Sequence, residues 1–554
     1  MDISTIDRTE SENFIIQNNI VKGAKIDFGV KNQSLGQLLL DTFSQYADHL
    51  AWLYLFWKIE PETGKQITFG QMKDRSIRLA LWLKQQGIGS GDIVTICSHN
   101  CLNNYVVMYS IFYIGAVYNS WHHEFTLDSA RHAYKVAKPK IVFTTSLMID
   151  TIQETIKLEN GNTRIVVYDD CNNNKETFED FIQMQKIKDV ETFTARKIEN
   201  LSTEPASLLF SSGTSGPAKA VKTNYDHLLN LVLTCSFKHM VPNKVTLWYS
   251  TTYWILGMRS MLASVFSRSI VILCRKYDPE YICQLIEKYQ INLILGLPNF
   301  ISSICKNKLY DRYDFSSVSE ILVGGAKLSQ HTIDGFRTHL SHVNRYQIYG
   351  MTENGLVCKQ TNKCKSLTSV GYVVPNVQVK TIDQKTGKTL GPNEAGEICV
   401  MSSFMFNGYY ANMQATIETI DENGWLHTGD VGYYDDSGEF FIIDRIKNIM
   451  KFRFHHIYPL DISELLLKHP DVVDVGVTSY PHEEDVEHVM AFVQKVPGSK
   501  VTEEELVELS STLGFYKKLW GGVKFVDALP RTMTGKIAIG AIKEMAKAYA
   551  DSKK

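Results

Sequence analysis

The chain has 554 residues, of which 44% are hydrophobic and 21% are charged, values typical of a folded protein with a large core. Its 58 Lys and Arg residues balance 60 Asp and Glu residues, so the formal net charge is −2. That balance lacks the basic footprint of nucleic-acid-binding proteins and favours a small-molecule ligand. The length predicts roughly two to four domains.

Helix-period segments alternate with short β-branched runs over the first 360 residues, a pattern typical of α/β folds with largely parallel sheets. The expected helices in this part are Ser76–Gln86 and Tyr281–Tyr289. The expected strands are Ile93–Cys97, Ile141–Thr144, Arg164–Tyr168, Ala206–Phe210, Ser269–Cys274, Ile291–Leu295 and Ile321–Val323. The most apolar stretch, Tyr105–Trp121, is too short for a membrane span, so we expect a buried helix and strand there.

The pattern changes after about residue 360. Turn pairs such as Asn423-Gly424 and Ser437-Gly438 separate short strands, which predicts a small antiparallel β region. Its expected strands are Val377–Ile382, Glu397–Met401 and Glu439–Ile443. From Asp444 onward we expect a compact unit with helices near Pro459–His469 and Thr502–Leu513 and strands near Val472–Thr478 and Val489–Val493. We therefore predict domains over residues 1–443 and 444–554.

Cysteine usage and the chain ends bear on location. Ten cysteines are scattered without a Cys-x-x-Cys pair, so we expect reduced thiols and no zinc site. Residues 1–12 have no apolar signal-peptide core, and the final residues are not the peroxisomal Ser-Lys-Leu address. We expect a cytoplasmic protein without stable membrane insertion, either a monomer or a weak dimer.

A loop rich in serine and glycine follows the strand Ala206–Phe210. Its phosphate-binding candidates are Ser211, Ser212, Gly213, Thr214, Ser215, Gly216 and Lys219. Glycines let the backbone approach a phosphate, amides and hydroxyls donate to its oxygens, and Lys219 adds positive charge. The loop is not a Walker A motif, because Pro217 and Ala218 separate the last glycine from the lysine. A helix capped by Asn224 or Asp226 is expected to follow. A flexible surface loop is the alternative.

Two glycine turns are candidates for contacts with a nucleotide. Tyr349-Gly350-Met351-Thr352-Glu353 places a hydroxyl beside a carboxylate, which suits a phosphate bound to Mg²⁺. Gly324-Gly325-Ala326 ends a predicted strand and suits the close approach of a flat ligand. An ordinary turn is the alternative in each case.

Three charged positions follow in the last third of the chain, together with a candidate hinge. Asp430 has the chemistry to accept hydrogen bonds from both ribose hydroxyls, and Arg445 would meet ribose or phosphate. Asp444 is the candidate hinge, and Lys536 lies in a Gly-Lys turn near the end. A solvated surface charge is the alternative for each of them.

Together and in this order, these motifs resemble the adenylate-forming superfamily of acyl-CoA synthetases, peptide-synthetase adenylation domains and beetle-type luciferases. The resemblance runs from about Leu39 to Ile542. It implies a large N-terminal domain of two α/β subdomains plus a β-barrel, and a small mobile α+β C-terminal domain. It also implies ATP-dependent activation of a carboxylic acid, with release of pyrophosphate and with Mg²⁺ as cofactor.

The resemblance assigns a role to each candidate residue. Ser211–Lys219 correspond to the phosphate loop, and Gly324–Ala326 with Tyr349 correspond to the adenine wall. Thr352 and Glu353 correspond to the α-phosphate and magnesium positions. Asp430 corresponds to the ribose ligand with Arg445 beside it, and Asp444 to the hinge. Lys536 corresponds to the lysine that bridges the substrate carboxylate and the α-phosphate.

The sequence departs from the family pattern on the expected route of a thiol to the adenylate. Trp254 stands where the family usually has a histidine, and Phe454 stands where a loop usually has a glycine. Lys451 matches a lysine that luciferases use in their oxidative step, although ligases often carry it as well. In the phosphate loop, Ala218, Ala220 and Ser215 replace the usual proline, glycine and threonine, and the donors are kept.

Two functions stay open at this point. One is an acid–CoA ligase with CoA as the second substrate, and the other is a luciferase-type oxygenase in which O₂ oxidises the adenylate. The acid pocket is expected to form from Tyr253–Met258, Gly296–Phe300, Gly324–Ala326 and Gly350–Val357. Its side chains include Trp254, Phe300 and Met351, which favours an apolar or aromatic acid.

Overall fold

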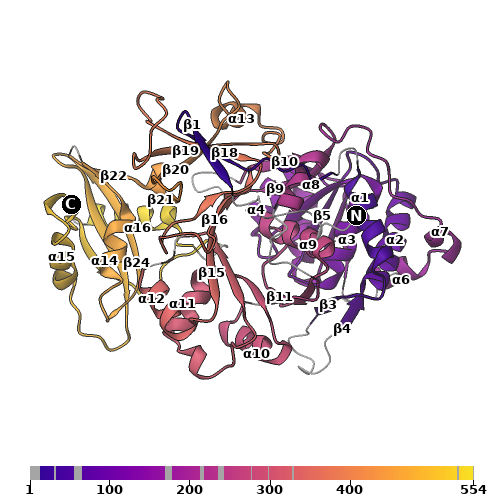
Figure 1. Cartoon of the computed structure of the whole chain (residues 1–554), viewed down its shortest axis with the longest axis horizontal. Helices are drawn as coiled ribbons and strands as arrows, with labels where there is room; N and C mark the ends of the chain where they lie inside the picture. The colour runs from indigo at the N-terminus through magenta and orange to yellow at the C-terminus, as the bar shows by residue number, and fades with distance from the viewer. Residues whose placement is uncertain are drawn as a thin grey trace.

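The computed structural model of the chain describes most of its residues. The described residues are 13–29, 33–54, 65–168, 177–211, 218–234, 242–275, 277–296, 298–326, 328, 330–453, 455–532 and 536–552. Two α/β layers and an antiparallel sheet form the larger part, and a smaller α+β lobe forms the other end of the molecule (Figure 1). This architecture confirms the fold class that the sequence predicted.

The first α/β sheet has six strands, and all but one of them run parallel. Its strand order is β10 (Ala220–Asn224), β9 (Pro205–Phe210), β6 (Val117–Trp121), β5 (Ile93–Cys97), β7 (Ile141–Thr144) and β8 (Arg164–Val167). The edge strand β10 is antiparallel to β9. Helices α1 (Leu35–Gln45), α2 (Phe69–Gln85), α3 (Leu102–Ile114), α4 (Leu127–Ala137) and α5 (Ile149–Leu158) accompany this sheet. Short helices α6 (Phe178–Gln183) and α7 (Ile187–Glu191) pack on α2.

The second α/β sheet has nine strands. Its order is β17 (Tyr372–Val373), β16 (Gly355–Lys359), β15 (Asn344–Met351), β14 (Glu320–Gly324), β13 (Leu293–Gly296), β11 (Val245–Trp248), β12 (Ile270–Leu273), β3 (Leu50–Tyr54) and β4 (Lys65–Thr68). Its helices are α8 (Tyr225–Thr234), α9 (Ile255–Ser267), α10 (Pro279–Tyr289), α11 (Pro298–Lys306) and α12 (Gln330–His339). Because β11 to β15 run parallel, the loops at their carboxyl ends lie along one edge.

The region expected to form a β-barrel contains a third, antiparallel sheet of six strands. Its order is β1 (Phe14–Gln17), β2 (Ile20–Gly23), β18 (Val377–Ile382), β19 (Gly396–Ser402), β20 (Leu426–Tyr434) and β21 (Phe440–Arg445). Figure 1 shows the indigo strand β1 lying beside the orange strands of this sheet. The helix α13 (Met413–Thr419) lies in the connection between β19 and β20.

The smaller lobe follows β21. Its sheet contains β23 (His455–Ile457), β22 (Met450–Phe452), β25 (Val486–Lys495) and β24 (Val472–His482), with β26 (Gly522–Phe525) paired to β25. Its helices are α14 (Pro459–Leu466), α15 (Glu503–Ser511) and α16 (Ile539–Ser552). It has a hydrophobic core of its own, built from buried side chains such as Phe452, Ile462 and Ala491. The lobe agrees with the predicted unit after Asp444, and the boundary itself stays a prediction.

The predicted start of one helix needs correction. Helix α2 begins at Phe69 and not at Ser76, because Thr68 and Gln71 form a capping box: the Gln71 amide donates to the Thr68 hydroxyl at 3.2 Å, and the Thr68 amide donates to the Gln71 side chain at 2.9 Å. The helix expected near Asn224 is α8, and strand β10, which the sequence did not predict, lies between it and the phosphate loop. The predicted cap is confirmed at Asn224, whose side chain accepts from the His227 amide at 2.8 Å.

Other expectations agree with the structure. The apolar stretch Tyr105–Trp121 forms most of the buried helix α3 and strand β6. Among the described residues, no helix combines the length and the apolar character that a membrane crossing requires. The cytoplasmic location and the monomeric or weakly dimeric state stay predictions.

The tight turn between β15 and β16 generates a first test. Gly355 has φ +77°, and a Cβ there would overlap the Leu231 side chain of α8. We expect Gly355→Ala to lower the free energy of unfolding by more than about 1 kcal/mol, because both the backbone conformation and the space oppose a side chain. Thermal and urea unfolding of the purified protein measure the loss.

Gly387→Ala is the matched control. Gly387 also has a positive φ, +69°, but nothing lies within 4 Å of the added Cβ. The decrease in the free energy of unfolding caused by Gly387→Ala should therefore reflect the backbone conformation alone. It should be smaller than the decrease caused by Gly355→Ala. Equal losses in both variants would contradict the close packing of this turn.

Candidate active site

The phosphate loop is closed at its base by its two ends. The Ser211 amide donates to the Lys219 carbonyl at 2.9 Å, and the Lys219 amide donates to the Ser211 hydroxyl at 3.4 Å. The ring Nε2 of His132, on α4, lies 2.8 Å from the Ala218 carbonyl, so the ring donates to that oxygen. The predicted ligands Ser212, Gly213, Thr214, Ser215 and Gly216 lie outside the described residues.

A segment that sequence reasoning missed joins the phosphate loop to the Thr352-Glu353 turn. The Lys222 amide of β10 donates to the Gly408 carbonyl at 3.1 Å, and the Tyr410 amide donates to the Ala220 carbonyl at 2.8 Å. On its other side, the Phe406 amide donates to the Glu353 carbonyl at 2.7 Å. Residues 406–410 therefore hold two predicted motifs in one place.

Tyr409 lies between the charged groups of those motifs. Its hydroxyl donates to Glu353 Oε1 at 2.8 Å, and the ammonium of Lys219 lies 4.8 Å from the centre of its ring. Burial and the charge of Glu353 raise the pKa of Tyr409, so the hydroxyl stays a donor. The aromatic run Gly408-Tyr409-Tyr410 was the only sequence feature that marked this position.

The adenine-wall candidates lie at the carboxyl ends of neighbouring strands. Gly324 ends β14 and is paired with Ile348 of β15, one residue before Tyr349. A Cβ on Gly324 would meet the Ile348 side chain at 2.7 Å. Gly350 is required by the hairpin itself, because a Cβ there would overlap the Gly355 carbonyl. Gly325 has φ +95° and is exposed together with Ala326.

Asp430 is held from two sides. The Tyr349 hydroxyl donates to Asp430 Oδ2 at 2.7 Å, and Nε of Arg445 lies 3.1 Å from Oδ1. Asp430 and Arg445 are direct partners across β20 and β21. Each carboxylate oxygen has two acceptor sites, so the group retains capacity for ribose hydroxyls.

A second carboxylate shapes the turn before Asp430. Oε1 of Glu397 accepts from the Gly429 amide at 3.1 Å, and Oε2 lies 3.1 Å from His427 Nδ1. The Thr428 hydroxyl accepts from the Asp430 amide at 3.0 Å. Sequence reasoning placed Glu397 only on a strand and missed this positioning contact.

Lys536 faces this same region from the smaller lobe. Although much of its side chain is exposed, protein crowds the charged end, and this desolvation lowers the pKa of Lys536. The positive charge of Arg445 lowers the same pKa further, and the negative charge of Asp430 opposes the shift. The structure therefore brings Lys536, Arg445 and Asp430 into one electrostatic cluster.

The predicted hinge residue Asp444 connects the two parts of the chain. Its Oδ1 accepts from the Arg445 amide at 2.7 Å and from Asn448 Nδ2 at 3.0 Å. Burial raises the pKa of Asp444, while these hydrogen bonds and one from the Leu460 amide favour its charged form.

A further contact crosses between the parts: Lys306 Nζ, on α11, donates to the Val473 carbonyl of β24 at 2.6 Å. Within the smaller lobe, Lys543 Nζ, on α16, donates to the Lys447 carbonyl at 3.1 Å. The Lys306 contact therefore holds the smaller lobe against the larger part.

The residues expected to act on the adenylate afterwards lie in two places. Trp254 is the N-cap residue of α9, and its ring lies 6.2 Å from that of His122. Burial lowers the pKa of His122 to about 4, so this histidine is neutral near pH 7. Lys451 instead lies in the smaller lobe, where its backbone amide donates to Oε2 of Glu487 at 2.5 Å. Phe454 lies outside the described residues, and Phe300 is fully buried in the core of the nine-stranded sheet.

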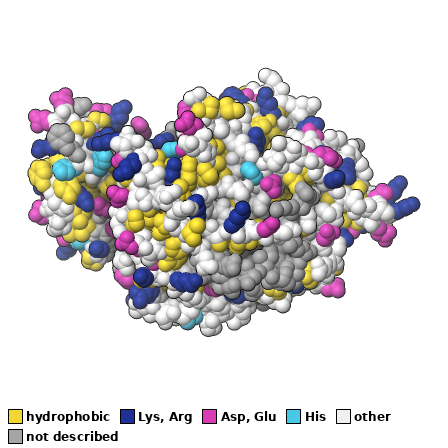
Figure 2. All heavy atoms as spheres, turned by 45° about the horizontal axis from the view of Figure 1, so that its top comes forward, with side chains coloured by type: hydrophobic (Ala, Val, Ile, Leu, Met, Phe, Trp, Pro, Cys, Tyr) yellow, Lys and Arg dark blue, Asp and Glu magenta, His cyan; other side chains and the backbone are white. Residues whose placement is uncertain are grey.

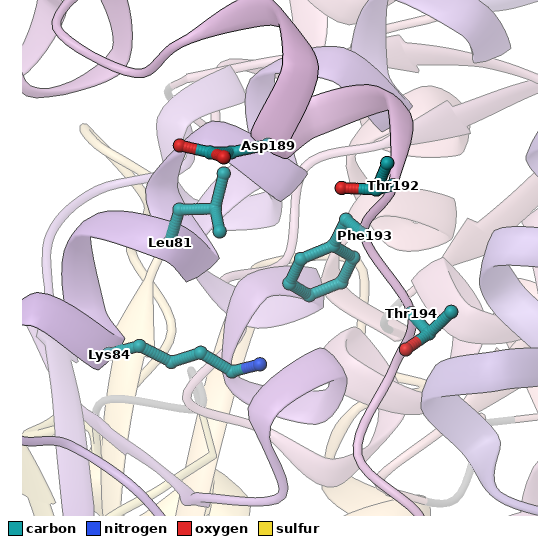
Figure 3. Close-up of a pocket in the computed structure, with 6 residues that line it drawn as sticks. All are labelled: Leu81, Lys84, Asp189, Thr192, Phe193 and Thr194. Atoms are coloured by element: carbon teal, nitrogen blue, oxygen red, sulfur yellow. The ribbon is translucent and has the colours of Figure 1, made fainter.

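A surface pocket of about 270 Å³ lies away from the candidate active-site residues. It is lined by Leu81, Lys84, Asp189, Thr192, Phe193 and Thr194 (Figure 3). The Lys84 ammonium lies 5.0 Å from the centre of the Phe193 ring. None of these lining residues is a candidate for nucleotide binding, and α7 lies at the end of the molecule opposite the smaller lobe (Figure 1).

Comparison with known proteins agrees with this arrangement. The AMP-binding enzyme family matches residues 41–410, and the C-terminal domain of AMP-binding enzymes matches residues 461–536. The chain belongs to the AMP-binding enzyme family. It is thus an adenylate-forming enzyme, as its ordered motifs indicated.

Two groups of relatives of this AMP-binding enzyme are about equally similar to it. A luciferin 4-monooxygenase of Luciola mingrelica is 31% identical and covers 96% of this chain and 98% of its own. A 4-coumarate-CoA ligase of Narcissus pseudonarcissus is 30% identical, covering 86% of this chain and 88% of its own. Overall identity therefore does not separate a luciferase from a ligase.

The solved structures add information on the fold. ATP-bound MatB from Rhodopseudomonas palustris superimposes with a TM-score of 0.83, and the apo form with 0.72; each is 23% identical and covers 92% of this chain and 99% of its own. Both forms of MatB therefore share the overall fold of this chain.

The contact between Tyr409 and Glu353 generates a second test. Tyr409→Phe removes the hydroxyl that donates to Glu353 and keeps the ring beneath Lys219. Loss of a hydrogen bond to a charged group typically costs about 1.5–3 kcal/mol, so we expect acid-dependent exchange of pyrophosphate into ATP to slow by roughly 10–100-fold. The exchange rate is measured at saturating ATP over a range of Mg²⁺ concentrations.

Tyr410→Phe is the control, because Tyr410 is the adjacent tyrosine and its ring is exposed. It should leave the exchange rate close to that of the unaltered protein. If Tyr409→Phe exchanged pyrophosphate as fast as the control, the Tyr409 hydroxyl would have no role in the site.

Proposed function

We propose that this chain activates a carboxylic acid with ATP and then transfers the acyl group to the thiol of CoA. In the first step a carboxylate oxygen attacks the α-phosphorus, the bond to the bridging oxygen breaks, and pyrophosphate leaves. In the second step the CoA sulfur attacks the acyl carbon of the adenylate, AMP leaves, and the thiol proton passes to solvent or a base.

The observation that carries the first step is the electrostatic cluster of Lys536, Arg445 and Asp430. Attack of one anion on another builds up negative charge in the transition state, and a positioned ammonium stabilises that charge more than it stabilises the separated reactants. Lys536 belongs to the smaller lobe, so its contribution depends on how this lobe lies against the larger part.

The residues around Glu353 fit a magnesium ion. Tyr409 engages one oxygen of Glu353, which leaves the second oxygen for a cation, and the neighbouring Thr352 offers a hydroxyl to a phosphate. A bound Mg²⁺ would supply Lewis-acid stabilisation of the phosphate oxygens. Lys219 would balance the charge of the phosphates from the other side of Tyr409.

The acid is proposed to be apolar or aromatic. Tyr253 and Trp254 are in contact, with ring centres 4.6 Å apart, and the neighbouring His122 is held neutral by burial. These groups offer an apolar wall without a countercharge for a second ionised group on the substrate, which disfavours amino acids.

A luciferase-type oxygenase is the second candidate, favoured by the similarity to luciferin 4-monooxygenases over nearly the whole chain. In that reaction O₂ would oxidise the adenylate in place of thiol attack. Trp254 replaces a histidine and adds bulk on the expected thiol route, an observation that fits either the oxygenase or a ligase with an altered approach.

One experiment separates these candidates. Apolar and aromatic acids, including a luciferin, are assayed for AMP and pyrophosphate release, each with and without CoA, in air and under a light detector. Release of AMP that requires CoA, with formation of the acyl-CoA thioester, is the expected result. Light that requires O₂ and the luciferin would support the oxygenase, and absence of both would overturn the proposed second step.

The role of Lys536 has its own test. We expect Lys536→Ala to lower pyrophosphate exchange by about 10²–10³-fold, since loss of one preorganised charge in an active site typically has this effect. ATP binding, measured by calorimetry, should persist because the phosphate loop and Asp430 are intact. Lys543→Ala in the same lobe, where the side chain contacts the Lys447 carbonyl, is the control. Unchanged exchange in Lys536→Ala would refute the role.

A further inference from the structure

The hairpin that joins β24 to β25 in the smaller lobe carries a cluster of three potential metal ligands. His482 is paired with Val486, and Tyr480 is paired with His488. Since alternate residues of a strand share a face, His482 and His488 lie on the same face of the hairpin. Asp485 lies in the turn between them. Figure 2 shows cyan histidine side chains at the surface of this lobe, on the left.

The three side chains already converge. Nε2 of His488 lies 2.9 Å from Oδ2 of Asp485, and Nδ1 of His482 lies 3.7 Å from the same oxygen. All three ligand atoms lie within 4.8 Å of one another. In a tetrahedral zinc site with bonds of roughly 2.0–2.1 Å, ligand atoms are about 3.4 Å apart. To surround an ion, Nδ1 of His482 would have to release the Asp485 amide, which donates to it at 3.3 Å, and the stacked rings of His482 and His488, with centres 3.6 Å apart, would have to turn.

Arg453 orients the carboxylate of Asp485. Oδ1 of Asp485 accepts from Nε of Arg453 at 2.6 Å, and the Arg453 amide donates to the Asp485 carbonyl at 2.7 Å. This leaves Oδ2 directed at the two histidines. Ligands held by such outer contacts are typical of metal sites in proteins.

We propose that His482, Asp485 and His488 bind a divalent transition-metal ion of the zinc class, with water as the fourth ligand. Imidazole and carboxylate donors suit Zn²⁺, Ni²⁺ and Cu²⁺ better than Mg²⁺ or Ca²⁺. The side chains of Asp485 and His488 are 12% and 16% exposed, and that of His482 is 35% exposed. The site is thus reachable from solvent and still largely held by the fold.

The ion would also fix the turn that contains Arg453. That residue has φ +52°, a conformation that costs energy for a side chain other than glycine, and it lies two residues after Lys451. With Oδ2 on the metal and Oδ1 on Arg453, Asp485 would connect the ion to this turn. The site is separate from the nucleotide site, so this proposal does not depend on which acid or acceptor the enzyme uses.

A second cluster, Glu397, Cys399 and His427, is the competing candidate within the described structure. Its Glu397 also positions the turn before Asp430, because it accepts from the Gly429 amide as described above. Cys399 is fully buried, so an ion would have to enter the core to reach its sulfur. We therefore assign the site to the hairpin.

The test uses the full chain after treatment with a chelator. Zn²⁺ is titrated in competition with a chromophoric chelator, and we expect one ion per chain at the hairpin. His482→Ala/His488→Ala should weaken that binding by at least about 10–100-fold, the range found for disturbed metal sites. His469→Ala is the control, because His469 is a histidine of the same lobe paired with Glu505 at 3.2 Å. Equal affinity in the double variant and the control would overturn the proposal.

The spectrum of bound Co²⁺ distinguishes the two clusters, and a milder variant provides a control for misfolding. Binding at the hairpin should give visible bands of nitrogen and oxygen ligation without a thiolate charge-transfer band. A thiolate band would assign the ion to a site that contains a cysteine and overturn the proposal. Asp485→Asn is the milder variant, since it keeps the size of the side chain. If circular dichroism shows it to be folded and it binds Zn²⁺ as tightly as the unaltered chain, the proposal also fails.

Discussion

Asp430 is a nearly buried carboxylate, 6% exposed, whose two oxygens are engaged by Tyr349 and Arg445. Removing either partner would leave a charge in a poorly solvated place, which is far more costly than the pair itself is stabilising. The contact joins two sheets of the larger part, because Tyr349 belongs to the nine-stranded sheet and Asp430 and Arg445 belong to the antiparallel one. Asp444, the predicted hinge residue, lies immediately beside it, and Lys536 approaches from the smaller lobe.

Backbone hydrogen bonds of residues 406–410 make the second connection between parts of the site. Residues 406–410 pair with β10 on one side and hold the Glu353 carbonyl on the other. A phosphate loop attached only at its strand would have to be ordered by the ligand, with a corresponding loss of conformational entropy. Because both its ends are hydrogen-bonded to each other and β10 is held by the 406–410 segment, part of that ordering is already present.

Much of the fold followed from local patterns, and the candidate site residues came from the ordered motifs and the resemblance that they carry. Strands β5, β7 and β18 were predicted residue for residue, because each is a short β-branched run bounded by turn residues. Strands β1, β2 and β10 were missed, since their residues are mixed in polarity and acquire strand structure from partners distant in the sequence. In the site, Tyr409 and Glu397 were missed for the same reason: their contacts with Glu353 and Gly429 are formed across the fold, and no local spacing predicts them.

The N-terminal strands have a consequence for synthesis of the protein. Lys22 of β2 is paired with Gln378 of β18, and the Ile26 amide donates to the side chain of Asn376, 350 positions later in the chain. At about 5–20 residues per second, a ribosome needs roughly 20–70 s to make the intervening stretch. During that time the first hairpin has left the ribosome and lacks the sheet that it will join. The α/β layers can form first, and the antiparallel sheet must close around a segment that has waited longest.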